Sequence, residues 1–225
     1  MQTTSNSSPG GPLMRDGIFE RIRGDILSCV LQPGSEIHEQ DLAQRYQVSK
    51  SPIRDALLRL REQCLVEVQP RKGYRVRPIS VADALELYAM RELYERACAM
   101  GAIDGASDVQ LAELDTFRAP PQSSRLPDWI AYNRRFHSAI AALCGNRRLA
   151  SATTDLIEQF DRLTYVSVTG VGANNGLQHF VDEHAGIVDA LQARDKRQAQ
   201  TLVREHVESS RKRTVDAIAN PVVVP

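Results

Sequence analysis

The feature that most constrains the fold is a pair of short helical patterns separated by a break of two residues. Glu39–Tyr46 predicts a first helix, and after Gln47-Val48 the Ser49 hydroxyl can cap a second helix that runs to Arg61. In the second helix an apolar stripe faces inward and a mostly basic face is left outside; the stripe is Ile53, Ala56, Leu57 and Leu60, and the outer face is Lys50, Ser51, Arg54, Arg59 and Arg61. A basic helix held in this way fits a DNA major groove.

The flanking segments complete a small winged domain. Isoleucines at helical spacing predict a helix over Arg15–Val30, which Pro33-Gly34 ends. After the helix pair, Leu65–Val68 and Tyr74–Arg77 alternate as two strands of a hairpin. The connecting tip carries Arg71 and Lys72 for charge and ends in Gly73, which lets the backbone approach a phosphate or a groove wall closely.

Charge is unevenly distributed although the formal net charge is zero. Residues 14–78 hold 12 Lys and Arg against 9 Asp and Glu, whereas residues 79–225 hold 16 against 19. Within 45–77 the basic residues number 9 and the acidic ones 3. This local cationic excess favours a polyphosphate partner for the first third of the chain.

Composition and cysteine spacing limit the class of protein. With 225 residues, the chain is long enough for one small and one larger domain, and no stretch approaches the about 18 uninterrupted apolar residues of a membrane span. The four cysteines lie far apart without a C-x-x-C pair, which indicates a reducing cytoplasm rather than a disulfide framework. Residues 1–13 and 219–225 are predicted to be disordered tails on domains at 14–78 and 79–218.

Residues 31–76 resemble the DNA-binding domain of GntR-type bacterial regulators. The segment reads LQPGSEIHEQDLAQRYQVSKSPIRDALLRLREQCLVEVQPRKGYRV, and its Pro-Gly, Leu-Ala, Val-Ser-x-x-Pro-x-Arg-x-Ala-Leu and Gly-x-x-Val elements fall in register with that family. The resemblance implies a winged helix-turn-helix that binds a palindromic operator as a homodimer, with transcriptional repression as the expected outcome.

The same resemblance assigns roles to individual side chains. It implies that Lys50 and Arg54 contact guanine edges or neighbouring phosphates, and Lys50 stands where the family more often has arginine. Lysine lacks the planar fork, so base discrimination there is expected to be weaker or shifted. The remaining expected DNA contacts position the backbone or belong to the wing: Gln40, Ser49, Ser51, Lys72 and Gly73. The alternative for this face is a solvated basic surface on an ordinary helical domain.

From Ser80 onward the pattern is all helical. Helices are expected from Ser80 through about Cys98 and beyond, from Ser107 to about Phe117, and then over Pro127–Cys144, Arg147–Val166, Gln178–Ala193 and Lys196–Ile218. Loops are expected at Gly145-Asn146, at Thr169–Gly176 and at Arg194-Asp195. The fold class is therefore mainly α, with an N-terminal winged helix-turn-helix and a C-terminal helical bundle.

Three histidines lie on the apolar stripes of different helices in this second domain. His137 shares a face with Asn133, one turn earlier, while His184 and His206 lie among apolar residues of their own helices. Imidazoles from three helices that point to one interior can bind zinc, nickel or a similar divalent ion, with the Asn133 carbonyl as a weaker fourth ligand. The alternative is buried histidines that are satisfied by hydrogen bonds. Glu183 is expected to point elsewhere, and His38 and His179 lie off these stripes.

Residues 80–213 resemble the FCD domain, the all-helical ligand-binding domain of FadR-like GntR regulators. The motifs that carry this are Asn133-x-x-Phe136-His137, Gly145-Asn146, Glu183-His184-x-x-Ile187-x-x-Ala190-Leu191 and His206. The resemblance implies a divalent metal on Asn133, His137, His184 and His206 beside an effector cavity. Asn133 departs from the family, where aspartate is more usual, and the lost negative charge is expected to weaken the metal.

A small organic acid is the expected effector of such a domain. Arg91 can pair bidentately with a carboxylate, with Tyr88 and Arg134 as further candidates, although a surface pair of Arg91 with Glu95 one turn later explains the arginine equally well. Two other functions stay open: a metal-dependent hydrolase that uses the three histidines, and a constitutive DNA-binding protein without an effector. The sequence has no H-E-x-x-H motif and no positioned general base, which argues against an enzyme.

Overall fold

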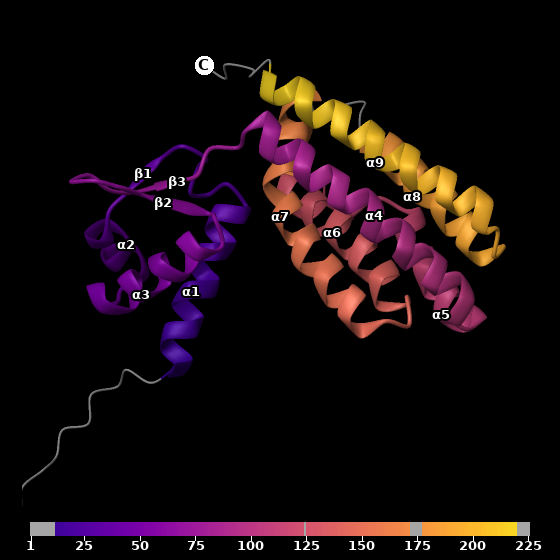
Figure 1. Ribbon diagram of the computed structural model, residues 1–225, viewed down its shortest axis with the longest axis horizontal. Coiled ribbons are helices and arrows are strands. Elements are labelled where there is room, and N and C mark those ends of the chain that lie inside the picture. The colour runs from indigo at the N-terminus through magenta and orange to yellow at the C-terminus, as the bar shows by residue number, and fades with distance from the viewer. Residues whose placement is uncertain (1–11, 124, 172–176, 220–225) are drawn as a thin grey trace, which may run out of the picture. The chain divides into compact units, whose positions relative to one another are not determined.

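The computed structural model describes residues 12–123, 125–171 and 177–219. The chain divides into two compact units, residues 1–78 and residues 79–225 (Figure 1). The predicted tails at 1–11 and 220–225 lie outside the described residues. The remaining tail residues, Pro12, Leu13 and Ala219, are helical, which corrects the prediction. Proline suits a first helical turn because its missing N–H has no partner there in any case.

The N-terminal unit is a winged helix-turn-helix. Its elements are α1 (Pro12–Leu27), β1 (Glu36–Ile37), α2 (Glu39–Tyr46), α3 (Lys50–Glu62), β2 (Val66–Gln69) and β3 (Gly73–Val76). The three strands form an antiparallel sheet in the order β1-β3-β2, and α1 packs against α3. The centre of the core is fully buried apolar side chains from α1 and α3: Ile22, Ile26, Ile53, Leu57 and Leu60.

The turn between α2 and α3 depends on one left-handed residue. Gln47 has φ 56° and ψ 47°, and its N–H closes the end of α2. Ser49 has the extended backbone of an N-cap, but its hydroxyl makes no capping hydrogen bond, so that part of the prediction is wrong. The side chain of Ser49 is exposed, and the first amides of α3 are not capped by it.

The C-terminal unit is a helical bundle. It contains α4 (Val81–Gly105), α5 (Asp108–Ala112), the 3₁₀ helix η1 (Glu113–Arg118), α6 (Leu126–Ala142), α7 (Arg147–Val171), α8 (Leu177–Gln192) and α9 (Lys196–Ala219). Ser80 caps α4 by accepting the Asp83 N–H, and Ser107 forms a capping box with Gln110. The long helices α4 and α9 pack along each other, and α6 packs on α7 (Figure 1).

Two boundaries in this unit differ from the prediction. The segment expected as one helix from Ser107 to Phe117 changes to 3₁₀ geometry after Ala112. Leu111, Leu114 and Phe117 are all buried at a spacing of three residues, and a helix with three residues per turn keeps them on one face. The loop predicted at Thr169–Gly176 is also too long, because α7 continues to Val171; residues 172–176 lie outside the described residues.

Candidate functional site

The outer face of α3 presents the predicted DNA-contacting side chains to solvent. Arg54 is exposed, and Glu39 of α2 holds its guanidinium through two hydrogen bonds, Nε to Oε1 at 2.9 Å and Nη2 to Oε2 at 2.7 Å. Lys50 Nζ donates to Gln40 Oε1 at 3.4 Å. The hydrogen bond from Arg54 lowers the pKa of Glu39, which keeps the carboxylate charged. Side chains of α2 therefore position Lys50 and Arg54, the two residues of α3 that are predicted to contact bases.

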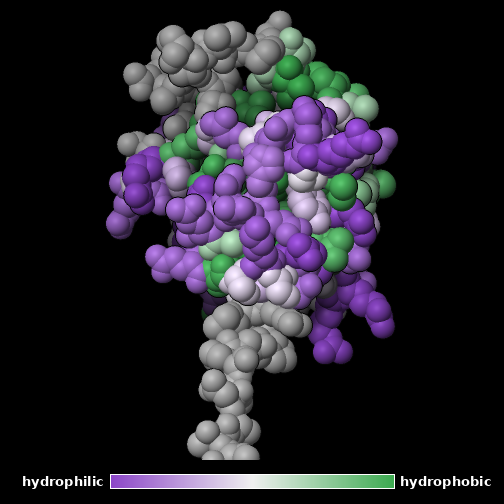
Figure 2. Space-filling view, turned by 90° about the vertical axis from the view of Figure 1, so that its left-hand side faces the viewer, coloured by the Kyte–Doolittle hydropathy of each residue, from purple (hydrophilic) through white to green (hydrophobic). Residues whose placement is uncertain are grey.

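The hairpin tip adds a second basic element. Lys72 Nζ lies 3.7 Å from Glu36 Oε1, and Gly73 has φ +94°, a conformation that side chains rarely adopt. A Cβ added at Gly73 would lie 3.0 Å from both His38 Nδ1 and the Ile37 carbonyl oxygen. Figure 2 looks onto the side of the N-terminal unit with α2, α3 and this hairpin, and hydrophilic residues cover most of it.

One basic residue on the outer face of α3 has a structural role. The Arg59 guanidinium lies 3.8 Å from the centre of the Phe19 ring of α1, a cation–π contact that anchors it to the domain itself. Arg61 is exposed near the end of the helix. Arg59 is thus held by its own domain, and the alternative of a solvated basic surface stays open for Arg61.

The three predicted histidines meet in the interior of the C-terminal unit. His137 of α6, His184 of α8 and His206 of α9 are buried, and each offers one ring nitrogen such that the three atoms lie within 4.8 Å of one another. The Nε2 atoms of His137 and His206 are 3.4 Å apart. The His184 ring is fixed by stacking on Phe136, with centroids 3.7 Å apart.

Two carboxylates, the buried Glu95 and the partly buried Glu183, hold the rings of this cluster. Glu95 Oε1 lies 3.0 Å from His137 Nδ1, and Glu183 Oε2 lies 2.7 Å from His206 Nδ1. Because an ionised carboxylate only accepts hydrogen bonds, each Nδ1 carries a hydrogen, and the two Nε2 atoms are turned toward each other. The third ring follows the same orientation, since His184 Nδ1 lies 3.3 Å from the Tyr132 hydroxyl.

The protonation states agree with this arrangement. Burial opposes ionisation of Glu95, but the charge of Arg91 and the hydrogen bond from His137 outweigh it and hold its pKa well below the usual range. Burial likewise opposes ionisation of Glu183, yet the hydrogen bond from His206 brings its pKa down to about 2. Burial lowers the pKa of His137 to about 4 and that of His184 well below 6.5. At neutral pH the cluster combines charged carboxylates with neutral His137 and His184.

Sequence reasoning missed the roles of both carboxylates. Glu183 was expected to point away from the histidines, but it lies between α8 and α9 and also contacts His179 Nε2 at 2.8 Å. The available signal was position, because Glu183 is next to His184 and faces α9 once α8 and α9 pack together. Glu95 was expected in a surface pair with Arg91; the pair exists, with Nε to Oε1 at 2.7 Å, but both side chains are buried.

Arg91 itself reaches the histidines. Its Nη2 lies 2.7 Å from His137 Nε2 and 3.4 Å from His206 Nε2, and its guanidinium lies 4.9 Å from the centre of the Phe160 ring. The other two predicted effector residues have different partners. Tyr88 shares its hydroxyl with Ser210 and Thr214 of α9, and Arg134 forms an ion pair with Asp161.

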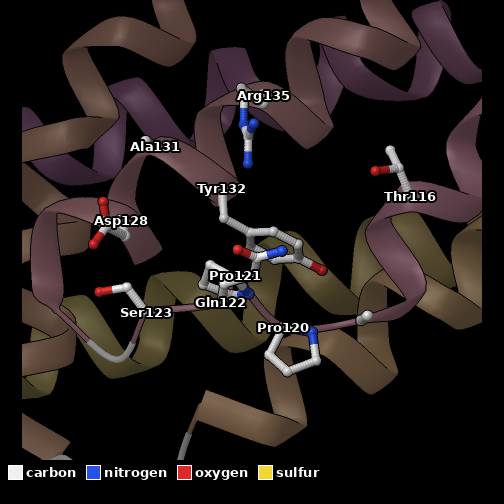
Figure 3. Close-up of a pocket in the computed structure, with 10 residues that line it drawn as sticks. Thr116, Pro120, Pro121, Gln122, Ser123, Asp128, Ala131, Tyr132 and Arg135 are labelled. Carbon is white, nitrogen blue, oxygen red and sulfur yellow. The ribbon is translucent and has the colours of Figure 1, made fainter.

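Asn133 lies beside the cluster on a small cavity. This cavity has a volume of about 20 Å³, room for about one water molecule, and is lined by Trp129, Tyr132, Asn133, Thr164, Val168, Phe180 and His184. Tyr132 also lines a larger, open pocket of about 640 Å³. Figure 3 shows this pocket, which is lined by Tyr132, Arg135 and the loop residues Pro120, Pro121 and Gln122, among others.

The cluster fits a divalent metal by two observations. His184 Nε2 is buried and finds no hydrogen-bond partner among the described residues. Leaving such a nitrogen unpaired costs free energy unless a ligand binds it. The 3.4 Å between the His137 and His206 Nε2 atoms also matches the about 3.3 Å expected between two nitrogens that each lie 2.0–2.1 Å from a tetrahedral zinc.

Comparisons with known proteins agree with both units. The model of the gntR family of bacterial regulatory proteins matches residues 14–76, and the FCD domain model matches residues 86–209. The HTH-type transcriptional regulator BphR of Paraburkholderia xenovorans is 30% identical over 87% of this chain and 82% of its own. The chain belongs to the GntR family and carries an FCD domain.

Other members of the GntR family are similar along most of the chain. The HTH-type transcriptional repressor RspR of Escherichia coli K12 is 25% identical, with 92% of this chain and 91% of RspR covered. The solved structure of E. coli McbR/YncC has a TM-score of 0.77 at 19% identity, covering 92% of this chain and 99% of that one, and supports the fold alone. This GntR-family chain is thus a DNA-binding transcription regulator and not an enzyme.

The family membership excludes one of the two alternative functions left open by the sequence. The hydrolase alternative is excluded because the relatives are transcription regulators. Among the described residues, no helix has the length and apolar character needed to cross a membrane.

Proposed function

We propose that this GntR-family chain is a homodimeric repressor whose operator affinity responds to a small organic acid bound beside a divalent metal in the FCD domain. The observation that carries the proposal is the convergence of His137, His184 and His206 around the buried Arg91, in a unit separate from the DNA-binding unit. The relative RspR is named a repressor, which supports repression as the outcome. Operator binding implies a location in the cytoplasm with the chromosome.

For DNA, the proposed base readers are Lys50 and Arg54. Arg54 can offer its remaining N–H groups to a guanine while Glu39 holds the other side of the fork. Gln40, Ser49 and Ser51 surround the first turn of α3, where the hydroxyl of Ser49 makes no cap hydrogen bond and phosphate oxygens could approach the amides. Lys72 and Gly73 are proposed to bring the wing against the neighbouring groove.

The DNA assignment is tested on an operator selected from randomised duplexes. Arg54→Ala is expected to weaken specific binding by at least tenfold, because it removes a bidentate base contact. Arg204→Ala serves as the control, since it removes the same charge from an exposed position on α9 in the other unit. Equal binding by the native protein and Arg54→Ala would overturn the role of α3, and fluorescence anisotropy at fixed salt measures both.

For the metal, the proposed ligands are His137, His184, His206 and Asn133, with zinc or nickel as the ion. Neutral imidazoles suit both ions, and a bound ion would supply a Lewis-acidic position for a carboxylate oxygen. Elemental analysis is expected to find one metal per chain in the native protein and in His38→Ala, and none in a triple alanine variant of the three histidines. Equal metal content in native and triple variant would contradict the site.

For the effector, Arg91 is the proposed carboxylate anchor. Tyr88 and Arg134 are proposed to line the approach, and each has to exchange its present partner to do so. The cavity beside Asn133 has room for about one water, so an effector can bind there only if the cavity widens. Tyr132 lines both this cavity and the larger pocket, and a movement of its ring would join the two. A thermal-shift screen with small mono- and dicarboxylates in the presence of zinc should identify a stabilising ligand, and loss of that shift in Arg91→Lys would support the anchor.

The dimer is proposed to form through α4. Three large apolar side chains on this helix are exposed, Leu85 at 38%, Met90 at 43% and Leu93 at 66%. They lie on the face opposite to Arg91 and Glu95, together with exposed alanines at 82, 89 and 97 and the exposed Glu86. A largely apolar stripe of this kind favours burial against a second copy of the chain.

A further inference from the structure

Arg91 is placed where a cation bound by the histidines would be. The side chain is 1% exposed, and its Nη2 is 2.7 Å from His137 Nε2 and 3.4 Å from His206 Nε2. Nε donates to Glu95 Oε1 at 2.7 Å, which fixes the rest of the guanidinium. The arginine therefore delivers a positive charge and an N–H donor to the nitrogens that converge in the cluster.

The contact distances show where the arginine lies relative to the lone pair of His137. His137 Nδ1 faces the Glu95 carboxylate at 3.0 Å and carries the ring hydrogen, because a carboxylate can only accept. A neutral imidazole then has one lone pair, on Nε2, and a metal ion bound to His137 needs it. Arg91 Nη2 lies 2.7 Å from Nε2 and also 3.5 Å from Nδ1, so the guanidinium lies against the ring beside this lone pair and not along it. A metal ion on Nε2 would therefore lie next to the guanidinium charge.

We infer that the Arg91 guanidinium and a divalent metal compete for His137 Nε2, so that metal binding displaces Arg91 from the histidine cluster. The inference rests on the proposed metal site. Like charges cause the competition, because Nη2 lies within 3.4 Å of two of the proposed ligand atoms. Neutral Asn133 offers no charge to offset this repulsion.

Displacement can be small and still change what Arg91 binds. The Nε–Glu95 hydrogen bond can persist while the terminal Nη groups turn away from the ring. Those groups are then available to an anion, and a carboxylate is the group that matches their fork geometry. By linkage, a carboxylate that holds Arg91 away from His137 strengthens metal binding, and metal strengthens carboxylate binding by the same factor.

The test compares metal affinity in the native full-length protein and two variants. Arg91→Met/Glu95→Gln removes the guanidinium and also the carboxylate that it would leave unpaired, while the new amide oxygen can still accept the His137 Nδ1–H. Glu95→Gln alone is the matched control, since it keeps Arg91. Zn²⁺ and Co²⁺ affinities are measured by competition with a chelator, and the Co²⁺ absorption spectrum reports the coordination. The double variant is expected to bind at least tenfold more tightly than the native protein.

The outcomes separate this inference from the proposed metal site. If the native protein binds one ion and the double variant binds it equally well or more weakly, the competition is overturned. It is also overturned if Glu95→Gln alone binds the metal as tightly as the double variant does. A native protein that binds no metal beside a double variant that binds one supports the competition and overturns the native metal site. No metal on either protein overturns both.

A second measurement needs no folded variant. In native protein labelled with ¹⁵N at arginine and histidine, the buried Arg91–His137 contact should give an Arg91 Nη2–H signal protected from exchange with water. One equivalent of Zn²⁺ is expected to abolish that signal and to shift His137 Nε2, while the Arg91 Nε–H signal can remain. A protected Arg91 Nη2–H signal that persists in zinc-saturated protein would overturn the displacement.

Discussion

At the scale of single residues, carboxylates decide what the arginines and histidines can do. Glu39 holds Nε and Nη2 of Arg54, so the guanidinium is oriented before any base is contacted. Glu95 and Glu183 accept hydrogen bonds from the Nδ1 atoms of His137 and His206 and thereby direct both Nε2 atoms inward. None of these pairings is visible from spacing within one helix, because each carboxylate acts on a residue of another helix.

The first prediction concerns Glu39. Glu39→Gln is expected to weaken specific operator binding by about tenfold. Without the carboxylate that accepts two hydrogen bonds from it, the Arg54 side chain is less ordered in the free protein, so ordering it against a guanine costs more conformational entropy. Glu62→Gln is the control, since it removes the same charge from the exposed end of α3. Binding to specific and random duplexes at one salt concentration measures the effect. Tighter specific binding by Glu39→Gln than by Glu62→Gln would show that Glu39 restrains Arg54 instead of supporting it.

The second prediction is a pH dependence of stability. The pKa of His137 in the folded protein is about 4, below the 6.5 of an exposed imidazole, so between these values the unfolded chain binds more protons. The contribution of His137 to the free energy of unfolding is therefore fully present above about pH 6.5. It falls as the pH drops toward 4, by about 2 kcal/mol between pH 7 and pH 5. Urea unfolding with a chelator present should show a smaller loss in His137→Gln than in native protein, whereas His38→Gln should behave as native.

At the scale of elements, α4 depends on a glycine for its close contact with the end of α6. A Cβ added at Gly101 would lie 2.3 Å from the Cys144 carbonyl oxygen, a backbone atom that cannot turn aside. Gly101→Ala is therefore expected to destabilise the C-terminal unit by about 1–3 kcal/mol, the usual cost of overpacking. Gly105→Ala in the same helix meets no atom within 4 Å and should be neutral or slightly stabilising. Denaturant unfolding compares the two; an equal loss in both would contradict the packing argument.

Helix positions and faces followed from the sequence because apolar periodicity decides them. Glu39–Tyr46 was predicted to the residue, and the stripe with His137, His184 and His206 correctly placed these residues in one interior. Strand β1 was missed because two residues give no alternation, and it forms only by pairing with β3. The site shows the same limit: the histidines follow from periodicity, whereas the Arg91–His137 contact depends on how α4 packs against α6.

At the scale of the whole molecule, one helix connects the histidine cluster to the proposed dimer surface. The inner face of α4 carries Arg91 and Glu95, and its outer face carries Leu85 and Leu93. An effector shifts operator affinity only if it binds one dimer geometry better than the other. In the proposed dimer, a rearrangement of Arg91 acts on the same helix that packs against the second copy, and we propose that the effector changes the dimer geometry in this way.

The last prediction tests that connection through the dimer itself. Leu93→Glu places a charge in the apolar stripe and is expected to shift the protein from dimer to monomer, because burying an unpaired carboxylate costs several kcal/mol. Operator affinity should fall with it, since a monomer contacts one half-site and loses the gain from linking two. Val109→Glu is the matched control: Val109 is 74% exposed on α5, outside the stripe. Analytical ultracentrifugation and operator binding over a range of protein concentrations measure both effects. A Leu93→Glu protein that stays dimeric, or a Val109→Glu protein that dissociates as readily, would move the interface away from α4 and leave the histidine cluster without this route to the DNA.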